Sequence, residues 1–210
     1  MAHTAKKSHQ EVLEALLLFN EFLMRFSSIK REIWVPNIEG RERNGEHSYQ
    51  LAMVAWFLNQ TLALNLDLFR LIRYALVHDL HEVHAGDSPA FTKGAKRTKS
   101  AKAKKLLSEE LAKDRLRKEW TKHFPDLIEA MDSYHAGEDE ESRFIYALEK
   151  LIAVINVYQD DGRAWKKLRL SLEVLDSYKS HRVKRHDSVK ALYEEMLVLL
   201  KAKPHLFNDS

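Results

Sequence analysis

The sequence predicts an all-helical protein, and three observations support this fold class. Only six Gly and four Pro occur among the 210 residues, so few positions interrupt a helix. In several segments the apolar residues recur at three- and four-residue steps, which is the spacing of an amphipathic helix. No alternating apolar and polar pattern of useful strand length is present. Because we also find no internal repeat and no convincing linker, we expect one domain over residues 1–210.

Three helices are expected in the first half of the chain. Apolar residues at helical spacing predict the first over residues 11–26, and a polar, arginine-containing connection over 27–46 follows it. From His47 onward the apolar residues extend around most of the helix circumference, which indicates a central, buried second helix. The third helix is expected over roughly residues 68–82. We expect these two helices to add four aromatic residues to the core: Trp56, Phe57, Phe69 and Tyr74.

Turn-forming residues mark both ends of the third helix. Asn65 and Asp67 precede it and offer an N-cap, and Gly86-Asp87-Ser88-Pro89 follows it. Glycine tolerates the left-handed cap and proline cannot continue the turn, so a tight polar elbow is expected after the helix. Later helices are expected over residues 96–122, 126–135, 139–160, 174–178 and 189–200.

Composition limits the kinds of function that the chain can have. Cysteine is absent, so any metal has to be bound by imidazole and carboxylate groups. A formal net charge of +3 is too small to indicate a nucleic-acid partner. The apolar run over residues 15–19 is interrupted by Asn20 and Glu21, far short of a membrane span. We therefore expect a cytoplasmic protein with no membrane partner.

One short segment concentrates the side chains that can do chemistry. Six potential ligands or proton carriers lie within ten positions directly after an apolar helix. Helical spacing lets His78, Asp79 and Glu82 converge on one side of the helix. Burying the Asp79 carboxylate is costly unless a cation or hydrogen bonds compensate its charge. Histidines are also common at helix ends for electrostatic reasons, so a His-Asp pair alone is weak evidence. The six residues are His78, Asp79, His81, Glu82, His84 and Asp87.

Two further residues are candidates to complete a metal site. Antiparallel packing of the second and third helices would bring His47 near His78 and Asp79. Glu149 lies inside an otherwise apolar stripe and is the candidate fourth ligand, although an ion pair with Lys150 explains it nearly as well. Imidazole and carboxylate ligands suit Zn, Mn, Fe, Co or Ni and do not select among them.

The order of these motifs resembles a known family. The chain contains Glu46-His47-Ser48, then Leu76-Val77-His78-Asp79-Leu80-His81-Glu82, then Ala85-Gly86-Asp87-Ser88-Pro89, then Ala147-Leu148-Glu149-Lys150-Leu151. Together they resemble the HD-domain hydrolases, in particular the small 5'-deoxynucleotidase-like branch, over roughly residues 22–165. The resemblance implies a single HD-type helical bundle that binds one divalent metal. It also implies that His47, His78 and Asp79 are metal ligands and that Glu82 and Asp87 are the catalytic carboxylates.

The chain departs from the family pattern at the late carboxylate. The family usually has aspartate in an Asp-Lys-Leu-like sequence, whereas this chain has Glu149, whose side chain is one methylene longer. The branch also often places an arginine and a tryptophan before the first histidine to contact phosphate and sugar. Trp34 corresponds to that tryptophan, and the arginine is one of three that we do not choose between: Arg31, Arg41 or Arg43.

The resemblance predicts hydrolysis of a phosphomonoester, foremost a nucleoside 5'-monophosphate. Glu82 would orient or deprotonate water and Asp87 would protonate the leaving sugar oxygen, or the two would exchange these roles. One alternative is a nucleoside triphosphohydrolase or a pyrophosphohydrolase. The other is a regulatory module that contains a metal and binds nucleic acid through residues 93–105, which we rank lower because few aromatic residues interleave those charges.

The remaining expectations concern the flanking histidines and the C-terminal helices. His81 and His84 are interpreted as surface histidines flanking the site, with second-sphere hydrogen bonds or a second metal as alternatives, and His135 as a helix cap. The helices within residues 166–202 are expected to pack on the core or to form a homodimer interface.

Overall fold

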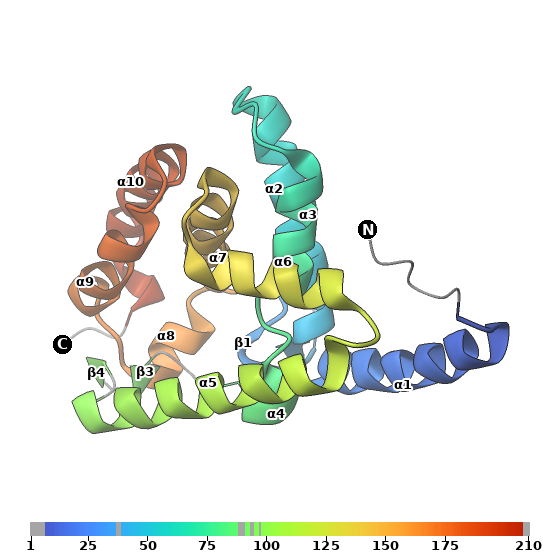
Figure 1. Ribbon diagram of the computed structural model, residues 1–210. Coiled ribbons are helices and arrows are strands. Elements are labelled where there is room, and N and C mark those ends of the chain that lie inside the picture. The colour runs from blue at the N-terminus through green and yellow to red at the C-terminus, as the bar shows by residue number, and fades with distance from the viewer. Residues whose placement is uncertain (1–6, 37–38, 88–90, 93–94, 97, 208–210) are drawn as a thin grey trace.

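The computed structural model describes residues 7–36, 39–87, 91–92, 95–96 and 98–207, without the side chains of 92, 95 and 96. Within these ranges the chain forms ten α-helices, a short 3-10 helix and two small antiparallel hairpins (Figure 1). The all-helical prediction is therefore confirmed. One contiguous hydrophobic core joins residues from the first helix to the C-terminal segment.

The centre of the bundle is α7 (Glu140–Gln159), which packs against more of the described elements than any other helix does. Its contacts include α2 (Asn44–Thr61) and α3 (Leu68–Val77), two neighbouring helices that the chain connects by a short turn. The apolar stripe expected over 139–160 is buried here, because Phe144, Leu148 and Ile152 have almost no exposed surface. The helices that present the motif residues are thus also the ones that build the core.

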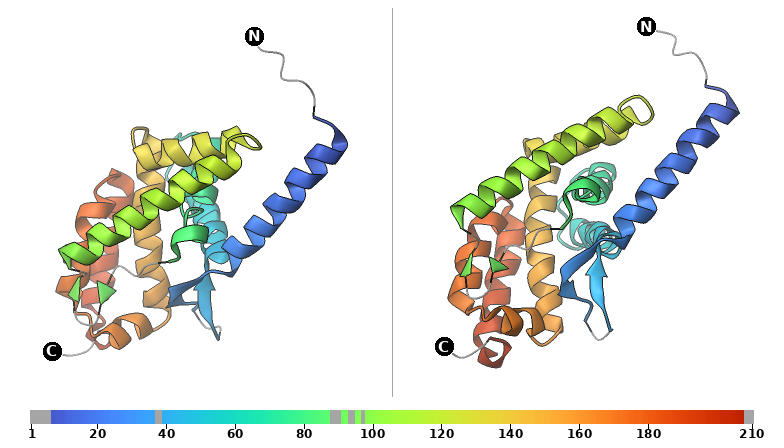
Figure 2. Two further views of the ribbon diagram at one scale, coloured as in Figure 1. Left: turned by 60° about the horizontal axis from the view of Figure 1, so that its bottom comes forward. Right: turned by 90° about the horizontal axis from the view of Figure 1, so that it is seen from below.

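A second layer crosses one end of this bundle. The long α5 (Lys99–Trp120) and α6 (Pro125–Ala136) run antiparallel along it, and the short α4 (Glu82–Ala85) lies between α3 and α5 (Figure 2). On the other side, α8 (Arg163–Leu168), α9 (Leu172–Val183) and α10 (Asp187–Lys201) lead to the 3-10 helix η1 (Pro204–Leu206). Both α9 and α10 pack on α7, so the C-terminal helices cover the core of the same chain.

The polar connection expected over 27–46 contains a hairpin that the sequence pattern did not reveal. Here β1 (Lys30–Trp34) pairs antiparallel with β2 (Arg41–Arg43), and a second small hairpin joins β3 (Phe91–Thr92) to β4 (Ala95–Lys96). These strands have two to five residues each, too few for an alternating pattern to stand out. The β1–β2 hairpin matters because it packs against α7 beside the motif residues.

Two aspartates cap the helices that carry the central motifs. Asp67 caps α3, where its side chain accepts hydrogen bonds from the backbone N–H groups of Phe69 and Arg70. Asp139 caps α7 by accepting from the Ser142 N–H at 2.7 Å, and it also accepts from the Tyr74 hydroxyl of α3 at 2.6 Å. Asp139 therefore fixes the start of α7 to α3.

The expectation that α2 is buried all round is wrong, and so is the aromatic core predicted for α2 and α3. Trp56, Phe57 and Phe69 are exposed, with Phe57 61% accessible, and only Tyr74 of the four is buried. One face of α2 packs on α1 (His9–Ser28), α3, α7 and β2, whereas the face that carries Met53, Trp56 and Phe57 is exposed. Periodicity alone does not distinguish an apolar exposed face from a buried one.

The first helix packs through only one end. Phe22 and Phe26 of α1 are buried, whereas Leu13 and Leu17 nearer its start are exposed, and Figure 2 shows this part of α1 extending away from the bundle. In the part of the chain that the structure describes, none of the helices is both long and apolar enough to cross a membrane. At the elbow, Gly86 has a φ of 71°, while Ser88 and Pro89 lie outside the described residues.

Candidate active site

Four motif side chains from three helices meet in the interior. His47 lies in the first turn of α2, His78 and Asp79 lie at the end of α3, and Glu149 lies in the middle of α7. One potential ligand atom from each lies within 4.8 Å of the corresponding atoms of the others. The antiparallel packing of α2 and α3 brings the start of one beside the end of the other. The structure thus brings the four proposed metal ligands together.

The two imidazoles are oriented as metal ligands require. The Nδ1–H of His78 donates to the carbonyl of Ala75 at 2.9 Å, which directs Nε2 toward Asp79, 3.0 Å from its Oδ2. Burial opposes protonation of His78, but the charge of Asp79 raises its pKa. His47 is only 1% exposed, and neither of its ring nitrogens has a hydrogen-bond partner among the described residues. Its Nδ1 lies 3.6 Å from Glu42 Oε2. A buried imidazole with unused nitrogens is costly, and a metal ion would satisfy it.

The chemistry of this cluster fits a divalent metal ion. Burial lowers the pKa of His47, with Arg31 adding to the effect, so its imidazole is neutral and available as a ligand. Burial opposes ionisation of Asp79, but His78 and Arg31 hold the pKa of Asp79 well below its usual range. Two imidazoles and two carboxylates form a donor set suited to first-row transition metals.

Arg31 connects three elements at the edge of the cluster. From β1, its Nη1 donates to Asp79 Oδ2 at 2.8 Å, and its Nε lies 3.0 Å from Glu42 Oε2 on β2. The same Nη1 is 3.4 Å from the side-chain oxygen of Asn44 at the start of α2. The guanidinium is buried, and the carboxylates of Asp79 and Glu42 raise its pKa against the effect of burial. Of the three candidate arginines, the structure places Arg31 at the cluster.

The other candidate substrate residues lie elsewhere. Arg41 pairs with Glu32 at 2.9 Å and lies 5.3 Å from the centre of the Trp34 ring. Arg163 and Lys167 also approach that ring, so Trp34 is enclosed by cations at the surface of the hairpin. Arg43 lies near Ser27 and Glu46 at the start of α2. Among the described residues that border the central cavity, Arg31 is present and Trp34, Arg41 and Arg43 are not.

Glu149 belongs to two sets of contacts at the same time. Its ligand atom belongs to the four-residue cluster, and both of its carboxylate oxygens lie 2.7 Å from the Lys150 ammonium. Burial opposes ionisation, yet Lys150 lowers the pKa of Glu149 to about 2. The two interpretations offered by the sequence, metal ligand and ion-pair partner, are therefore compatible in one geometry. A metal at this position would share the carboxylate with Lys150 or displace the ammonium.

Glu82 and Asp87 line the same cavity beside the cluster. Asn44 donates to Glu82 Oε2 at 2.7 Å and fixes its orientation. Burial, together with the charges of Asp79 and Asp87, raises the pKa of Glu82 to about 8. Burial likewise raises the pKa of Asp87. Two carboxyl groups that retain protons more readily than usual are suited to proton transfer near neutral pH.

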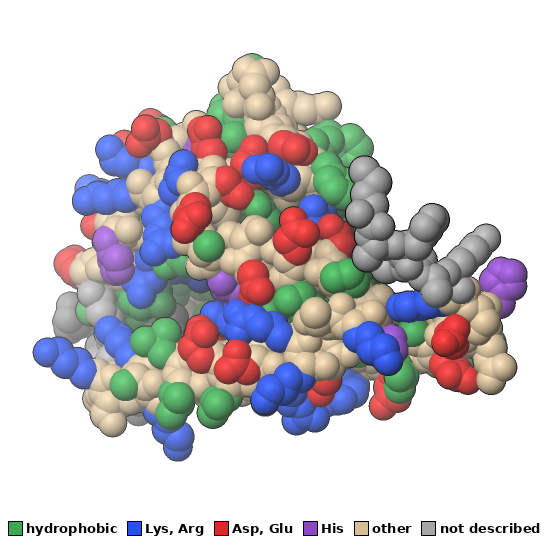
Figure 3. All heavy atoms as spheres, viewed as in Figure 1, with side chains coloured by type: hydrophobic (Ala, Val, Ile, Leu, Met, Phe, Trp, Pro, Cys, Tyr) green, Lys and Arg blue, Asp and Glu red, His purple; other side chains and the backbone are tan. Residues whose placement is uncertain are grey.

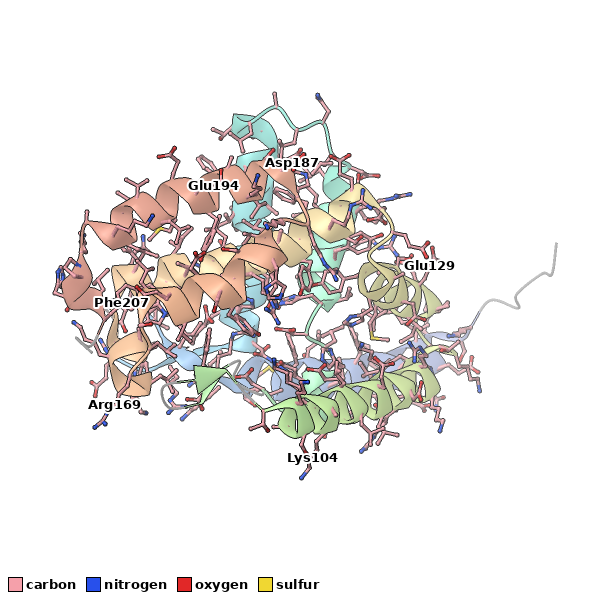
Figure 4. The ribbon with its side chains drawn as sticks, turned by 90° about the vertical axis from the view of Figure 1, so that its left-hand side faces the viewer. Lys104, Glu129, Arg169, Asp187, Glu194 and Phe207 are labelled. Carbon is pink, nitrogen blue, oxygen red and sulfur yellow. The ribbon has the colours of Figure 1, made fainter. Side chains whose placement is uncertain are left out.

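The cavity that contains these groups has a volume of about 340 Å³, within the range of sites for small molecules. It opens between α5 and the C-terminal helices, where Figure 3 shows a hollow with basic and histidine side chains at its rim. Figure 4 views the molecule from the left of Figure 1: Lys104, Asp187 and Glu194 point outward from α5 and α10. The charged side chains that line the cavity are different residues from these outward-pointing ones.

Several cavity residues were not predicted from the sequence. They include cations contributed by helices outside the motifs, of which Lys179 is buried and donates to the carbonyl of Lys150 at 3.0 Å. Burial and the neighbouring Lys150 lower the pKa of Lys179 to about 7. One signal was available, because Lys179 occupies the same helical stripe as the buried Leu175 and Val183. The cavity residues missed in this way are Lys113, Tyr134, Tyr146, Tyr178, Lys179 and Arg185.

The fold and the cluster together define an all-helical protein with a buried centre of histidine and carboxylate ligands, of the kind that holds a divalent metal. The family model of the HD domain matches residues 24–191, and the chain therefore belongs to the HD domain family. The family resemblance inferred from the ordered motifs is confirmed by this match.

Named relatives agree with this assignment. The 5'-deoxynucleotidase HDDC2 of Mus musculus is 32% identical over 151 residues, covering 69% of this chain and 70% of that protein. The Homo sapiens protein of the same name is 30% identical, covering 70% of this chain and 69% of its own length. Among solved structures, a predicted metal-dependent phosphohydrolase from Magnetospirillum magnetotacticum MS-1 has a TM-score of 0.77 at 22% identity, covering 96% of this chain and 99% of the other. This last similarity concerns the fold.

Proposed function

We propose that the chain is a metal-dependent phosphohydrolase that converts a (deoxy)nucleoside 5'-monophosphate to the nucleoside and phosphate. The observation that carries the proposal is the meeting of His47, His78, Asp79 and Glu149 within 4.8 Å, in a cavity that also contains Glu82 and Asp87. The relatives named as 5'-deoxynucleotidases support the choice of substrate.

The proposed metal ligands are His47, His78, Asp79 and Glu149, with one divalent ion drawn from Mn, Co, Zn, Fe or Ni. Such an ion supplies Lewis acidity, which polarises a phosphoryl oxygen and acidifies water toward a pKa of about 7. The chain orients this set itself: Ala75 fixes the ring of His78, and Arg31 fixes Asp79. The proposal therefore includes the metal ligands and also the residues that orient them by hydrogen bonds.

The chain's own proton carriers are Glu82 and Asp87. Glu82, held by Asn44, orients water and accepts its proton, and Asp87 gives a proton to the leaving sugar oxygen. Both carboxyl groups have raised pKa values, so either can hold the proton, and the exchanged assignment is equally consistent with the geometry. Arg31 lines the cavity and places a positive charge beside the phosphate.

Asp79→Asn tests this proposal, because it retains the shape of the side chain and removes the negative charge. We expect phosphate release from nucleoside monophosphates to fall by more than about 100-fold, with loss of bound metal measured by elemental analysis. Asp132→Asn is the matched control, since Asp132 pairs with Arg117 on the surface. If Asp79→Asn keeps both turnover and metal, the proposal is wrong.

A longer phosphate chain is the second candidate substrate, and one observation favours it. The cavity is lined by more cations than a single phosphate needs: Lys105, Lys113, Lys150, Lys179 and Arg185 in addition to Arg31. Three of them already have carboxylate partners, namely Lys150 with Glu149, Lys105 with Glu109 and Lys113 with Glu110. Ion-exchange chromatography of the products separates the cases, because a triphosphohydrolase releases tripolyphosphate and a pyrophosphohydrolase releases pyrophosphate.

The homodimer expected through the C-terminal helices stays a prediction. The buried faces of α9 and α10 are occupied by α7. Exposed apolar residues remain on α10, namely Val198 and Leu199, and a dimer through this region would have to cover them.

A further inference from the structure

Two histidines at the cavity are not used by the metal cluster. His81 lies in the turn before α4, and His135 lies near the end of α6, with ring centroids 5.4 Å apart in an edge-to-face arrangement. His81 is 5% exposed, and its Nδ1 has no hydrogen-bond partner among the described residues. The Nε2 of His135 is likewise buried without a partner there. Both side chains line the cavity, so each has a nitrogen available to a bound molecule.

A buried lysine completes this group. Lys113 of α5 is 9% exposed and also lines the cavity. It shares a helical stripe with the buried Leu116 and Trp120, an unusual place for a cation. Its ammonium lies 2.8 Å from the carboxylate of Glu110, a side chain that is 61% exposed and therefore well screened by water. Two of the three ammonium hydrogens remain for another acceptor.

The chemistry of this group suits an anion and not a second metal ion. In the part of the chain that the structure describes, neither histidine belongs to a group of three or more closely spaced potential metal ligands. The carboxylate on the same wall, Glu109, is paired with Lys105 at 3.4 Å. Burial, and then the charge of Lys113, lower the pKa of His135 to about 3, so its ring is neutral and has one N–H to donate. A lysine ammonium beside two imidazoles repels cations and attracts oxyanions.

The group lies next to the metal cluster. The charge of Asp79 acts on both His81 and His135, and Tyr134 packs against the rings of His78 and His135 at 6.2 Å and 5.1 Å. We propose that His81, His135 and Lys113 form the pocket that holds the phosphoryl group of the substrate beside the metal centre. This inference rests on the proposed function. The three donors come from the turn before α4, from α5 and from α6.

The test measures binding of inorganic phosphate to the metal-loaded protein by titration calorimetry. We expect His81→Leu, His135→Leu and Lys113→Met each to weaken phosphate binding about tenfold or more, with metal content unchanged. His81→Asn and His135→Gln, whose amides can replace the Nδ1 and Nε2 donors, should restore part of the affinity. His84→Leu is the matched control, because His84 pairs with Glu119 and is not among the described residues that line the cavity.

Three results would overturn this assignment. The first is unchanged phosphate affinity in Lys113→Met, a variant that leaves both histidines in place. The second is a second equivalent of metal in the wild-type protein that His81→Leu and His135→Leu lose. The third is phosphate binding that does not compete with a nucleoside monophosphate. A different result would contradict the proposed function alone. In that case the wild-type protein would bind phosphate through these three residues but would hydrolyse no nucleotide.

Discussion

At the scale of single residues, Arg31 determines how the carboxylates of the site are arranged. It contacts Asp79 and Glu42 with two different nitrogens, so both carboxylates keep their charge in a buried setting. A lysine would present one ammonium on a flexible stem and could not hold both acceptors in the same geometry. Arg31 therefore positions a proposed metal ligand and also places a positive charge at the cavity that is proposed to receive the phosphate.

We expect Arg31→Lys to lower kcat/KM for the nucleotide by about 100-fold, because Asp79 loses its orienting partner while the net charge is retained. Arg41→Lys, which changes an arginine of the same hairpin outside the cavity, should alter kcat/KM by less than about twofold. Steady-state phosphate release from both variants provides the measurement. A larger effect of Arg41→Lys than of Arg31→Lys would show that the substrate binds at the Trp34 surface.

The sequence predicted the residues of the cluster better than those of the surrounding cavity. His47, His78, Asp79 and Glu149 could be identified because each is a ligand type set in an apolar helix, in a recognisable order. Which of the three arginines lies at the cluster depends on the register of the β1–β2 hairpin. The strands of this hairpin are too short to be recognised in the sequence, so the arginine could not be identified from it. Lys113 and Lys179 were missed because a lysine in an amphipathic helix is ordinarily assigned to the solvated face.

At the scale of elements, the relative position of α3 and α7 determines where their ligands meet. Asp139 caps α7 and accepts a hydrogen bond from Tyr74 of α3, so one carboxylate fixes both helices. Its hydrogen bonds lower the pKa of Asp139 although burial opposes the shift. Because the folded-state pKa is depressed, the stabilisation is present above the unfolded pKa of 3.8 and disappears as the pH falls through the lower folded value.

Asp139→Ala should lower the free energy of unfolding by about 2 kcal/mol at pH 7, through loss of the cap and of the bond to Tyr74. Tyr74→Phe, which leaves the cap intact, should cost about 1 kcal/mol. Urea unfolding followed by circular dichroism measures both. The difference between wild type and Asp139→Ala should shrink below pH 3.8, and a difference that grows on acidification would contradict this account.

Most helices could be predicted within a few residues of their observed ends, because their stripes and caps were visible. The helix expected over 139–160 is observed as Glu140–Gln159, and Asp67 caps α3 as one of its two candidates. The third helix was expected to reach Glu82 but ends at Val77, where a turn separates it from α4. His78, Asp79 and Glu82, in and after that turn, all line one cavity.

At the scale of the whole molecule, bound metal should stabilise the fold. The proposed ligands include two carboxylates in the interior, and a cation would compensate their negative charges. A divalent ion at 100 times its Kd adds about 2.7 kcal/mol to the free energy of unfolding when it binds the native state alone. For a chain of this size we expect the Tm to rise by roughly 5–10 °C. Thermal unfolding with metal or with chelator measures the shift. The shift should vanish in Asp79→Asn, and an equal shift there would place the metal elsewhere.

The proposed ligands are far apart along the chain, and this has a consequence for how the protein matures. About 30 residues separate His47 from His78, and about 70 separate Asp79 from Glu149. In the unfolded chain, an ion bound to all four ligands would have to close two long loops, and closing them costs conformational entropy. In the folded bundle the ligands are already close together, so binding the ion does not incur this cost. Metal is therefore expected to bind after the bundle has folded, through the cavity mouth beside α5.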